Sequence, residues 1–265
     1  MGRISEKFKV LSAKDEKALI VYLTAGDPSM DVTKSLIFAL EKAGVDILEI
    51  GVPFSDPTAD GPVIQAASQR ALKTGTTLAG VLALVADIRK VSEIPIVLFG
   101  YFNPIFAYGV EKFAQAAQAA GVDGVLVVDL PPEEAGELRI HTDAAGLYFI
   151  SLVAPTTGKD RLKTILQSAT GFLYCISVTG VTGIAQPKIE DIAREVGKIR
   201  KLTKMPIAVG FGISNAEQAK AIGALVDGIV IGSAMVKLID EHSNSSELLK
   251  VVSDYAGKIK EGLRR

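Results

Sequence analysis

The sequence predicts a (β/α)8 TIM barrel with an extra N-terminal helix, formed as a single domain by residues 1–265. Short β-branched apolar runs recur along the chain, and a stretch with helical periodicity follows each of them. One phrase also repeats: a helix end, a turn and an aspartate precede an apolar strand in AGVDILEIG (43–51), AGVDGVLVVD (120–129) and ALVDGIVIG (224–232). Repetition of one unit is typical of a closed barrel or a doubly wound sheet. Eight units without a linker favour the barrel, for which about 250 residues is a usual length.

The predicted strands are apolar on both faces, as parallel strands covered by helices should be. They are residues 18–23, 46–51, 94–100, 123–129, 147–153, 172–177, 206–212 and 227–233. Helical patterns between them include residues 30–44, 77–91 and 109–121. Strand and helix in alternation imply parallel strands joined by right-handed crossovers.

The N-terminal segment MGRISEKFKVL predicts an amphipathic helix, because Ile4, Phe8 and Leu11 have the spacing of one helix face. We expect it to pack as a cover under the barrel. Its charges do not resemble a signal peptide, and no apolar run approaches the roughly 18 residues of a membrane span. These features predict a cytoplasmic protein.

The composition argues against some classes of protein. Lys and Arg number 29 and Asp and Glu number 30, so the net charge of -1 lacks the basic excess of a nucleic-acid-binding protein. The one cysteine, Cys175, excludes an internal disulfide, and its apolar neighbours predict a buried structural thiol.

The stretch LEIGVPFSDPTADGP, residues 48–62, concentrates acids directly after a predicted strand. Because side chains alternate along a strand, Ile47 and Glu49 share one face and Leu48 and Ile50 the other. The helix-facing side takes the two apolar residues, so Glu49 points into the barrel near its mouth. Burial there raises a carboxyl pKa and suits general acid–base catalysis. The alternative is a structural ion pair with a Lys or Arg.

Asp60 lies on the following loop, where Pro53, Pro57 and Pro62 restrict the backbone. A stiff loop would hold its carboxylate in place, although Asp before Gly is also a common turn former. Asp56, before Pro57, is interpreted as a loop-structuring or contact residue.

The sequence also limits the possible chemistry. We expect neither His141 nor His242 at a strand end, the first in a helix–loop region and the second in the tail, which argues against a zinc site built from histidines. No lysine lies within a predicted strand, which weakens a Schiff-base mechanism, and no serine has a histidine partner for a hydrolase triad. The chemistry that remains is acid–base catalysis by carboxylates, without a metal or a covalent intermediate.

Glycine-bearing stretches in the last third predict a phosphate site. They are TGVTG (179–183), GFGIS (210–214) and Gly232–Ser233, and the last two follow the seventh and eighth strands. GFGIS lacks the third glycine of a dinucleotide motif and TGVTG lacks the lysine of a P-loop. Tight turns alone are the alternative. The long polar segment 177–191 predicts a lid, with Thr182 closing over the acids when ligand binds.

Taken together, these residues closely resemble the α subunit family of tryptophan synthase. The resemblance covers essentially the whole chain. Its motifs are LEIGVPFSDPTADGP, YFNPI (101–105), DLPPEE (129–134), GVTG (180–183), GFGIS and GSA (232–234). The chain departs from the family pattern at Thr58, where an aliphatic residue is usual, and at Tyr22, where Phe is common.

The resemblance implies retro-aldol cleavage of indole-3-glycerol phosphate to indole and glyceraldehyde 3-phosphate, with Glu49 and Asp60 as the catalytic carboxylates. The family's phosphate contacts correspond to Gly183, Phe211, Gly212, Gly232 and Ser233. The indole pocket corresponds to Tyr22, Phe99, Tyr101, Val128, Leu152 and Tyr174, for each of which plain barrel core is the alternative.

The resemblance also implies a partner. A β subunit would carry pyridoxal phosphate, in an αββα assembly, and this chain would bind no cofactor or metal of its own. The loop with Pro53, Asp56 and Pro57 and the predicted lid would form the contact surface. Two other functions stay open from the residues alone: a sugar-phosphate isomerase or epimerase on the same barrel type, and a non-catalytic barrel subunit.

Overall fold

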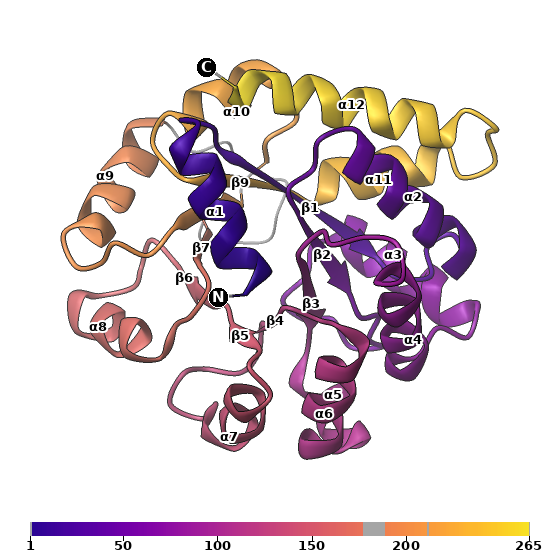
Figure 1. Ribbon diagram of the computed structural model, residues 1–265, viewed down its shortest axis with the longest axis horizontal. Helices are drawn as coiled ribbons and strands as arrows, with labels where there is room; N and C mark the ends of the chain where they lie inside the picture. The colour runs from indigo at the N-terminus through magenta and orange to yellow at the C-terminus, as the bar shows by residue number, and fades with distance from the viewer. Residues whose placement is uncertain (1, 177–188, 211, 265) are drawn as a thin grey trace.

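The computed structural model describes residues 2–176, 189–210 and 212–264, and within them parallel strands form one ring-shaped sheet surrounded by helices (Figure 1). The strand order is β5-β4-β3-β2-β1-β9-β8-β7-β6. The strands are β1 (Ala18–Thr24), β2 (Ile47–Gly51), β3 (Ile96–Gly100), β4 (Gly124–Val127), β5 (Tyr148–Phe149), β6 (Ser151–Val153), β7 (Leu173–Ile176), β8 (Ile207–Gly210) and β9 (Gly228–Ile231). The predicted barrel is confirmed, with parallel pairing at every described strand pair.

The fifth predicted strand, residues 147–153, is divided at Ile150 into β5 and β6. β5 pairs with β4, whereas β6 pairs with β7, so the two edges of the sheet belong to one short segment. The backbone N–H of Ile150 still donates to the carbonyl of Val125 at 2.9 Å. Within the described ranges, nine strands therefore occupy the eight positions that the sequence predicts, and the barrel is nearly closed.

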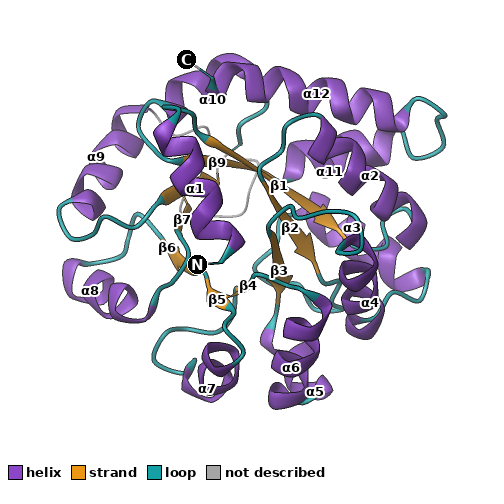
Figure 2. Ribbon diagram, in the orientation of Figure 1, coloured by secondary structure: helices purple, strands orange, loops and turns teal. Residues whose placement is uncertain are grey.

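Helices surround the ring, purple around the orange strands of Figure 2, except that α1 lies across one end of it. They are α1 (Arg3–Ala13), α2 (Met30–Lys42), α3 (Pro62–Lys73), α4 (Leu78–Ile88), α5 (Phe102–Tyr108), α6 (Val110–Ala120), α7 (Gly136–Ala144), α8 (Lys159–Ser168), α9 (Ile189–Arg200), α10 (Ala216–Gly223), α11 (Ser233–Glu241) and α12 (Leu248–Leu263). Polar side chains cap several of them; for example, Ser29 accepts the N–H of Val32 at the start of α2. His141 lies on α7. The tail expected at His242 is instead the turn between α11 and α12.

Two apolar layers form the core. The outer layer packs the helices against the sheet, and the inner layer fills the barrel. Helix α1, which crosses the ring in Figure 1, closes one end: Ile4, Phe8 and Leu11 are buried within the inner cluster, and the Phe8 and Phe172 rings lie 5.6 Å apart. The prediction of an N-terminal cover is confirmed.

The repeated aspartates fasten the strands at the N-terminal face of the barrel. Each accepts the backbone N–H of a residue at the neighbouring strand: Leu19 donates to Asp46 at 2.9 Å, Ile96 to Asp123 at 2.8 Å and Ile207 to Asp227 at 2.7 Å. Each also pairs with a cation from the helical layer: Lys260 with Asp46, Arg89 with Asp123, and Arg200 with Asp227. The repeated phrase is therefore a structural device on the face of a TIM barrel that usually serves stability.

We expect Asp46→Ala to lower the free energy of unfolding by roughly 3 kcal/mol, because it would leave the buried ammonium of Lys260 with only the more distant carboxylate of Glu16, at 3.6 Å, and would remove the acceptor of the Leu19 N–H. Lys260 is only 3% exposed and lies 2.7 Å from Asp46. Urea unfolding monitored by circular dichroism measures the change. Asp160→Ala is the control, since Asp160 pairs with Lys163 on the surface and such pairs contribute at most about 1 kcal/mol. Equal losses in the two variants would contradict this interpretation.

Among the described residues, no single helix combines the length and apolar character of a membrane span; α3 and α4 meet those criteria only as a pair, with a 92° bend between them. The single domain over residues 1–265 stays a prediction.

Candidate active site

Glu49 lies on the inner face of the barrel. Ile47, two residues earlier on β2, belongs to the inner apolar cluster, whereas Leu48 and Ile50 belong to the outer one, as the alternation along the strand predicts. The side chain of Glu49 is 0% exposed. Within the described residues, neither of its carboxyl oxygens has a hydrogen-bond partner. For the alternative of a structural ion pair, Glu49 therefore has no partner in that part of the chain.

The electrostatics of Glu49 follow from this burial. Desolvation disfavours the charged carboxylate and raises the pKa of Glu49 from its usual 4.5 to about 8. At neutral pH the group is a protonated acid in an apolar surrounding. A carboxyl with such a pKa can both donate and accept a proton near neutrality.

Asp60 lies on the loop that follows β2 and is half-buried. The hydroxyl of Tyr101 donates to its Oδ2 at 3.0 Å. Desolvation raises the pKa of Asp60 to about 6, and the bond from Tyr101 opposes that rise. Asp60 is therefore mostly anionic at a pH where Glu49 is mostly neutral, so the two carboxyls hold different protonation states.

The loop from residue 52 to residue 61 is fixed by side chains as well as by its prolines. Pro53 is buried, Pro57 is half-buried and Pro62 opens α3. The side-chain amide of Gln65 donates to the carbonyl of Asp60 at 2.9 Å and to that of Pro57 at 3.4 Å. Sequence reasoning identified the prolines but missed Gln65, because nothing in the sequence distinguishes it from any other polar residue of a helix.

Tyrosines surround the two acids. Tyr22 on β1 is paired in register with Glu49. Desolvation is the main cause that raises the pKa of its hydroxyl, and the charges of Asp60 and Glu49 raise it further. The pKa of Tyr174 on β7 is also raised, by desolvation first and then by Glu49, Tyr22 and Asp60. Both tyrosine hydroxyls, on strands β1 and β7, thus respond to the charges of Glu49 and Asp60. The two tyrosines and the two acids therefore lie around one site.

Two glycines of the quoted motifs, Gly51 and Gly210, make room for these rings, a role that sequence reasoning did not assign to them. A Cβ at Gly51 would lie 2.1 Å from the hydroxyl of Tyr22, and one at Gly210 would lie 2.2 Å from that of Tyr174. The hydroxyl of Tyr22 accepts a bond from Thr24 at 3.3 Å. Each tyrosine therefore depends on a glycine of the neighbouring strand.

The other predicted pocket residues lie in the same region. Phe99 packs edge-on against Tyr22, with ring centroids 5.2 Å apart. Phe99, Val128, Leu152 and Tyr174 are partly buried and pack against the inner apolar cluster. Tyr101, at the start of α5, is buried against Phe54. These side chains can belong to the core and also line a pocket, because they are only partly buried and cover the inner apolar cluster next to the acids.

Of the predicted phosphate residues, the structure describes three. Gly232 is the N-cap of α11 and Ser233 is its first residue, while Gly212 lies between β8 and α10 with a positive φ of 22°. Val236 on α11 belongs to the same apolar cluster as Tyr22, so α11 begins next to the acid site. Gly183, Phe211 and the predicted lid residue Thr182 lie outside the described residues.

The residues predicted to contact a partner differ in exposure. Asp56 is exposed and accepts a bond from the hydroxyl of Ser55, whereas Pro53 is buried within the chain. Pro57 is half-buried between them. Asp56 is therefore the one of the three whose side chain is freely accessible.

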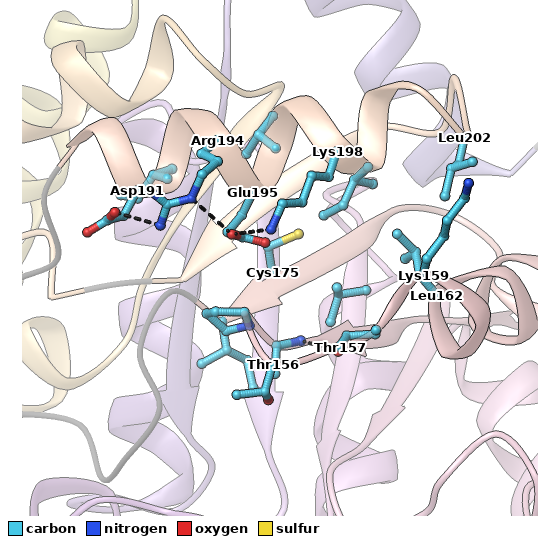
Figure 3. A pocket seen from close by; sticks show the side chains of 18 of the residues that line it. Thr156, Thr157, Lys159, Leu162, Cys175, Asp191, Arg194, Glu195, Lys198 and Leu202 are labelled. Atoms are coloured by element: carbon cyan, nitrogen blue, oxygen red, sulfur yellow. Dashed lines mark hydrogen bonds and ion pairs between the residues drawn. The ribbon is translucent and has the colours of Figure 1, made fainter.

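A cavity lined by described residues of α8, α9 and the strands beneath them does not include the acids. It measures about 800 Å³ and lies between α8 and α9, on the outer face of β6, β7 and β8 (Figure 3). Charged side chains of α9 occupy its rim, and Asp191, Arg194, Glu195 and Lys198 form a chain of ion pairs there. Cys175 lies on its floor, where burial raises the pKa of the thiol to about 12. The predicted buried thiol is confirmed, and Glu49 and Asp60 are separate from this cavity.

Within the described ranges, no three His, Cys, Asp or Glu side chains gather as a possible metal site. A parallel barrel with two carboxyls of raised pKa near the carboxyl ends of its strands, enclosed by aromatic side chains, belongs to the class of acid–base enzymes built on the TIM barrel.

Comparison with known proteins identifies the family. A family model described as tryptophan synthase alpha chain matches residues 8–264. The tryptophan synthase alpha chain of Geotalea daltonii is 49% identical over 263 residues, 99% of both chains, and that of Citrifermentans bemidjiense is 48% identical, over 99% of this chain and 98% of the relative. The structure of subunit alpha from Legionella pneumophila str. Paris superposes with a TM-score of 0.93 at 38% identity, covering 99% and 98% of the two chains. A tryptophan synthase chain from Mycobacterium tuberculosis gives 0.92 at 33% identity, covering 100% and 99%. This chain belongs to the tryptophan synthase alpha chain family.

Proposed function

We propose that this chain cleaves indole-3-glycerol phosphate to indole and glyceraldehyde 3-phosphate in tryptophan biosynthesis, with Glu49 and Asp60 as its catalytic carboxyls. One observation carries the assignment of the residues. In a member of this family, a glutamate that is fully buried and without a hydrogen-bond partner among the described residues lies inside the barrel, and an aspartate with a lower pKa lies on the loop that follows the same strand.

Glu49 moves the protons of the reaction. As a neutral acid it protonates C3 of the indole ring, which leaves positive charge on the ring nitrogen. It then accepts the proton of the hydroxyl on the carbon attached to C3. The bond between that carbon and C3 breaks, its electron pair returns to the ring, and the aldehyde is released. A pKa of about 8 leaves both protonation states accessible to Glu49.

Asp60 stabilises the charge that develops. Its carboxylate accepts a hydrogen bond from the ring N–H and opposes the positive charge of the protonated ring. A pKa of about 6 keeps it anionic at neutral pH. The bonds from Tyr101 and Gln65 hold the acid and its loop in one position, which limits the reorganisation that the reaction requires.

Binding of the substrate uses the remaining predicted residues. Its phosphate is placed at the start of α11, where Gly232 and Ser233 expose backbone N–H groups, together with Gly212, Gly183 and Phe211. Its ring is placed among the aromatic and aliphatic side chains Tyr22, Phe99, Tyr101, Val128, Leu152 and Tyr174. Thr182 closes the site as part of a lid.

The chain acts with a β subunit in an αββα assembly and carries no cofactor of its own, whereas the partner holds pyridoxal phosphate. The loop that carries Asp56, with Pro53 and Pro57, contacts the partner. Support comes from the name of the family and from the full-length likeness to a chain of tryptophan synthase from M. tuberculosis. We place the enzyme in the cytoplasm.

The direct test is to incubate the purified chain with indole-3-glycerol phosphate and measure free indole. Release of indole is the expected result, and its absence, both alone and with a β subunit, would contradict the proposal. The isomerase or epimerase alternative is not favoured, because family membership points to a lyase.

The pH dependence of kcat/KM should be bell-shaped. Activity requires Asp60 deprotonated, so it falls below about pH 6, and it requires Glu49 protonated, so it falls above about pH 8. Initial rates of indole release at low substrate concentration, measured from pH 5 to 9.5, give both limbs. A profile that is flat between pH 7 and 9.5 would contradict the acid role of Glu49.

A further inference from the structure

The hydroxyl of Tyr101 connects two parts of the acid loop. It donates to Oδ2 of Asp60 at 3.0 Å and accepts the backbone N–H of Ala59, also at 3.0 Å. With both its donor and its acceptor capacity used, the hydroxyl has one defined orientation. The side chain is 3% exposed and its ring packs against Phe54 at 5.3 Å, so it has little freedom to turn away from Asp60.

The backbone position of Tyr101 is fixed as well. Tyr101 directly follows β3 and is the N-cap residue of α5, whose first N–H, from Phe102, donates to Asp129 at 2.8 Å. The backbone of Asp60 is held separately, because Gln65 donates to its carbonyl at 2.9 Å. Carboxylate and backbone of Asp60 thus have two independent attachments, one from β3 and α5 and one from α3.

Other titratable groups face Asp60, but Tyr101 is the one whose side chain donates a hydrogen bond to its carboxylate among the described residues. Tyr22 on β1 and Tyr174 on β7 respond to the charge of Asp60, and Glu49 on β2 acts on the same two hydroxyls. The hydroxyl of Tyr22 is bonded to Thr24. Among the described residues, no lysine, arginine or histidine pairs with Asp60. The bond from Tyr101 is the one side-chain hydrogen bond found for the Asp60 carboxylate in that part of the chain.

We propose that Tyr101 is a positioning residue of the cleavage reaction, whose hydroxyl holds the Asp60 carboxylate toward the ring nitrogen and keeps it anionic. This role goes beyond lining the indole pocket, and it rests on the proposed function. A bond donated to a carboxylate stabilises its charged form, which is the direction in which Tyr101 acts on the pKa of Asp60. Without the hydroxyl, burial acts on that carboxylate unopposed and its pKa rises above 6.

The test compares three variants of the full chain. Tyr101→Phe keeps the ring and removes the hydroxyl. Gln65→Ala releases the backbone of Asp60 but leaves the bond from Tyr101 intact. Tyr108→Phe makes the same change as the first variant at the last residue of α5, where the tyrosine ring faces Lys112 rather than the acids.

For Tyr101→Phe we expect the acid limb of the kcat/KM profile to move up by about one pH unit, the size expected for loss of a hydrogen bond to a charged group. Relative to the unchanged chain, kcat/KM then falls about fivefold at pH 6 and little at pH 8. Gln65→Ala should lower kcat/KM by a similar factor at every pH, and Tyr108→Phe should match the unchanged chain. A loss that is equal at pH 6 and pH 8 in Tyr101→Phe would reduce Tyr101 to a lining residue.

A second readout does not need turnover. Carbon-13 NMR of chain labelled in its aspartate carboxyls, with the Asp60 signal assigned by its loss in Asp60→Asn, gives the titration of Asp60 directly. We expect a midpoint near pH 6 that rises in Tyr101→Phe and stays in Gln65→Ala. Equal midpoints in Tyr101→Phe and the unchanged chain would overturn the proposal. A shifted midpoint in a chain that releases no indole would refute the proposed function and leave the control of Asp60 by Tyr101 standing.

Discussion

Glu49→Gln should lower kcat/KM for indole release by a factor of about 10² to 10⁴, the usual contribution of a general acid or base. The amide has the size of the neutral acid that the barrel encloses at pH 7, so the pocket keeps its shape. It can neither give a proton to C3 nor accept one from the substrate hydroxyl. The loss should therefore be in kcat, with binding of an unreactive analogue that lacks the hydroxyls left nearly unchanged.

Glu137→Gln is the matched control, because Glu137 is exposed on α7 and away from the site. It should keep full activity. If Glu49→Gln were as active as this control, Glu49 would have no catalytic role, and the non-catalytic barrel subunit would become the better interpretation of the chain.

The same substitution should stabilise the protein in alkaline solution. Folding raises the pKa of Glu49 from 4.5 to about 8, so between these values the folded chain retains a proton that the unfolded chain has released. Stability then falls as pH rises, by up to about 1.4 kcal/mol per pH unit. Above pH 8 the accumulated loss is on the order of 5 kcal/mol, and a Gln at this position does not incur it.

Urea unfolding at pH 5 and at pH 8.5 measures this effect as a difference between variants. Glu49→Gln and the unchanged chain should differ little at pH 5, whereas the variant should be more stable by several kcal/mol at pH 8.5. Contributions from other groups, including Asp60, cancel in the comparison. A stability difference that is the same at both pH values would mean that folding does not raise the pKa of Glu49. We therefore expect Glu49→Gln to gain stability at alkaline pH and to lose activity, so the buried acid lowers stability but is needed for the reaction.

Local patterns were enough to predict most of the fold and the position of the main acid. Alternation along residues 47–50 determined which way Glu49 points, because only one assignment leaves apolar residues on both sides of the strand. The spacing of Ile4, Phe8 and Leu11 predicted the covering helix for the same reason. Such patterns need no knowledge of distant contacts.

Contacts between distant segments could not be predicted in this way. The bond between Tyr101 and Asp60 joins residues 41 positions apart, and that between Lys260 and Asp46 spans 214 positions. The division of the fifth strand at Ile150 follows from its pairing with two different neighbours, β4 and β7, which its own sequence does not encode. The repeated aspartates were visible as a pattern, but their role needed the neighbouring strands and the helical cations.

The protonation state of Glu49 is the quantity on which the proposed chemistry depends most directly. Infrared difference spectra between the unchanged chain and Glu49→Gln, recorded from pH 4 to pH 10, isolate the absorption of this one carboxyl. We expect the band of a protonated carboxyl in an apolar environment to persist at pH 7 and to disappear with a midpoint near pH 8. A midpoint near 4.5 would show an ordinary, solvated carboxylate and would contradict the assignment of Glu49 as the acid of the reaction.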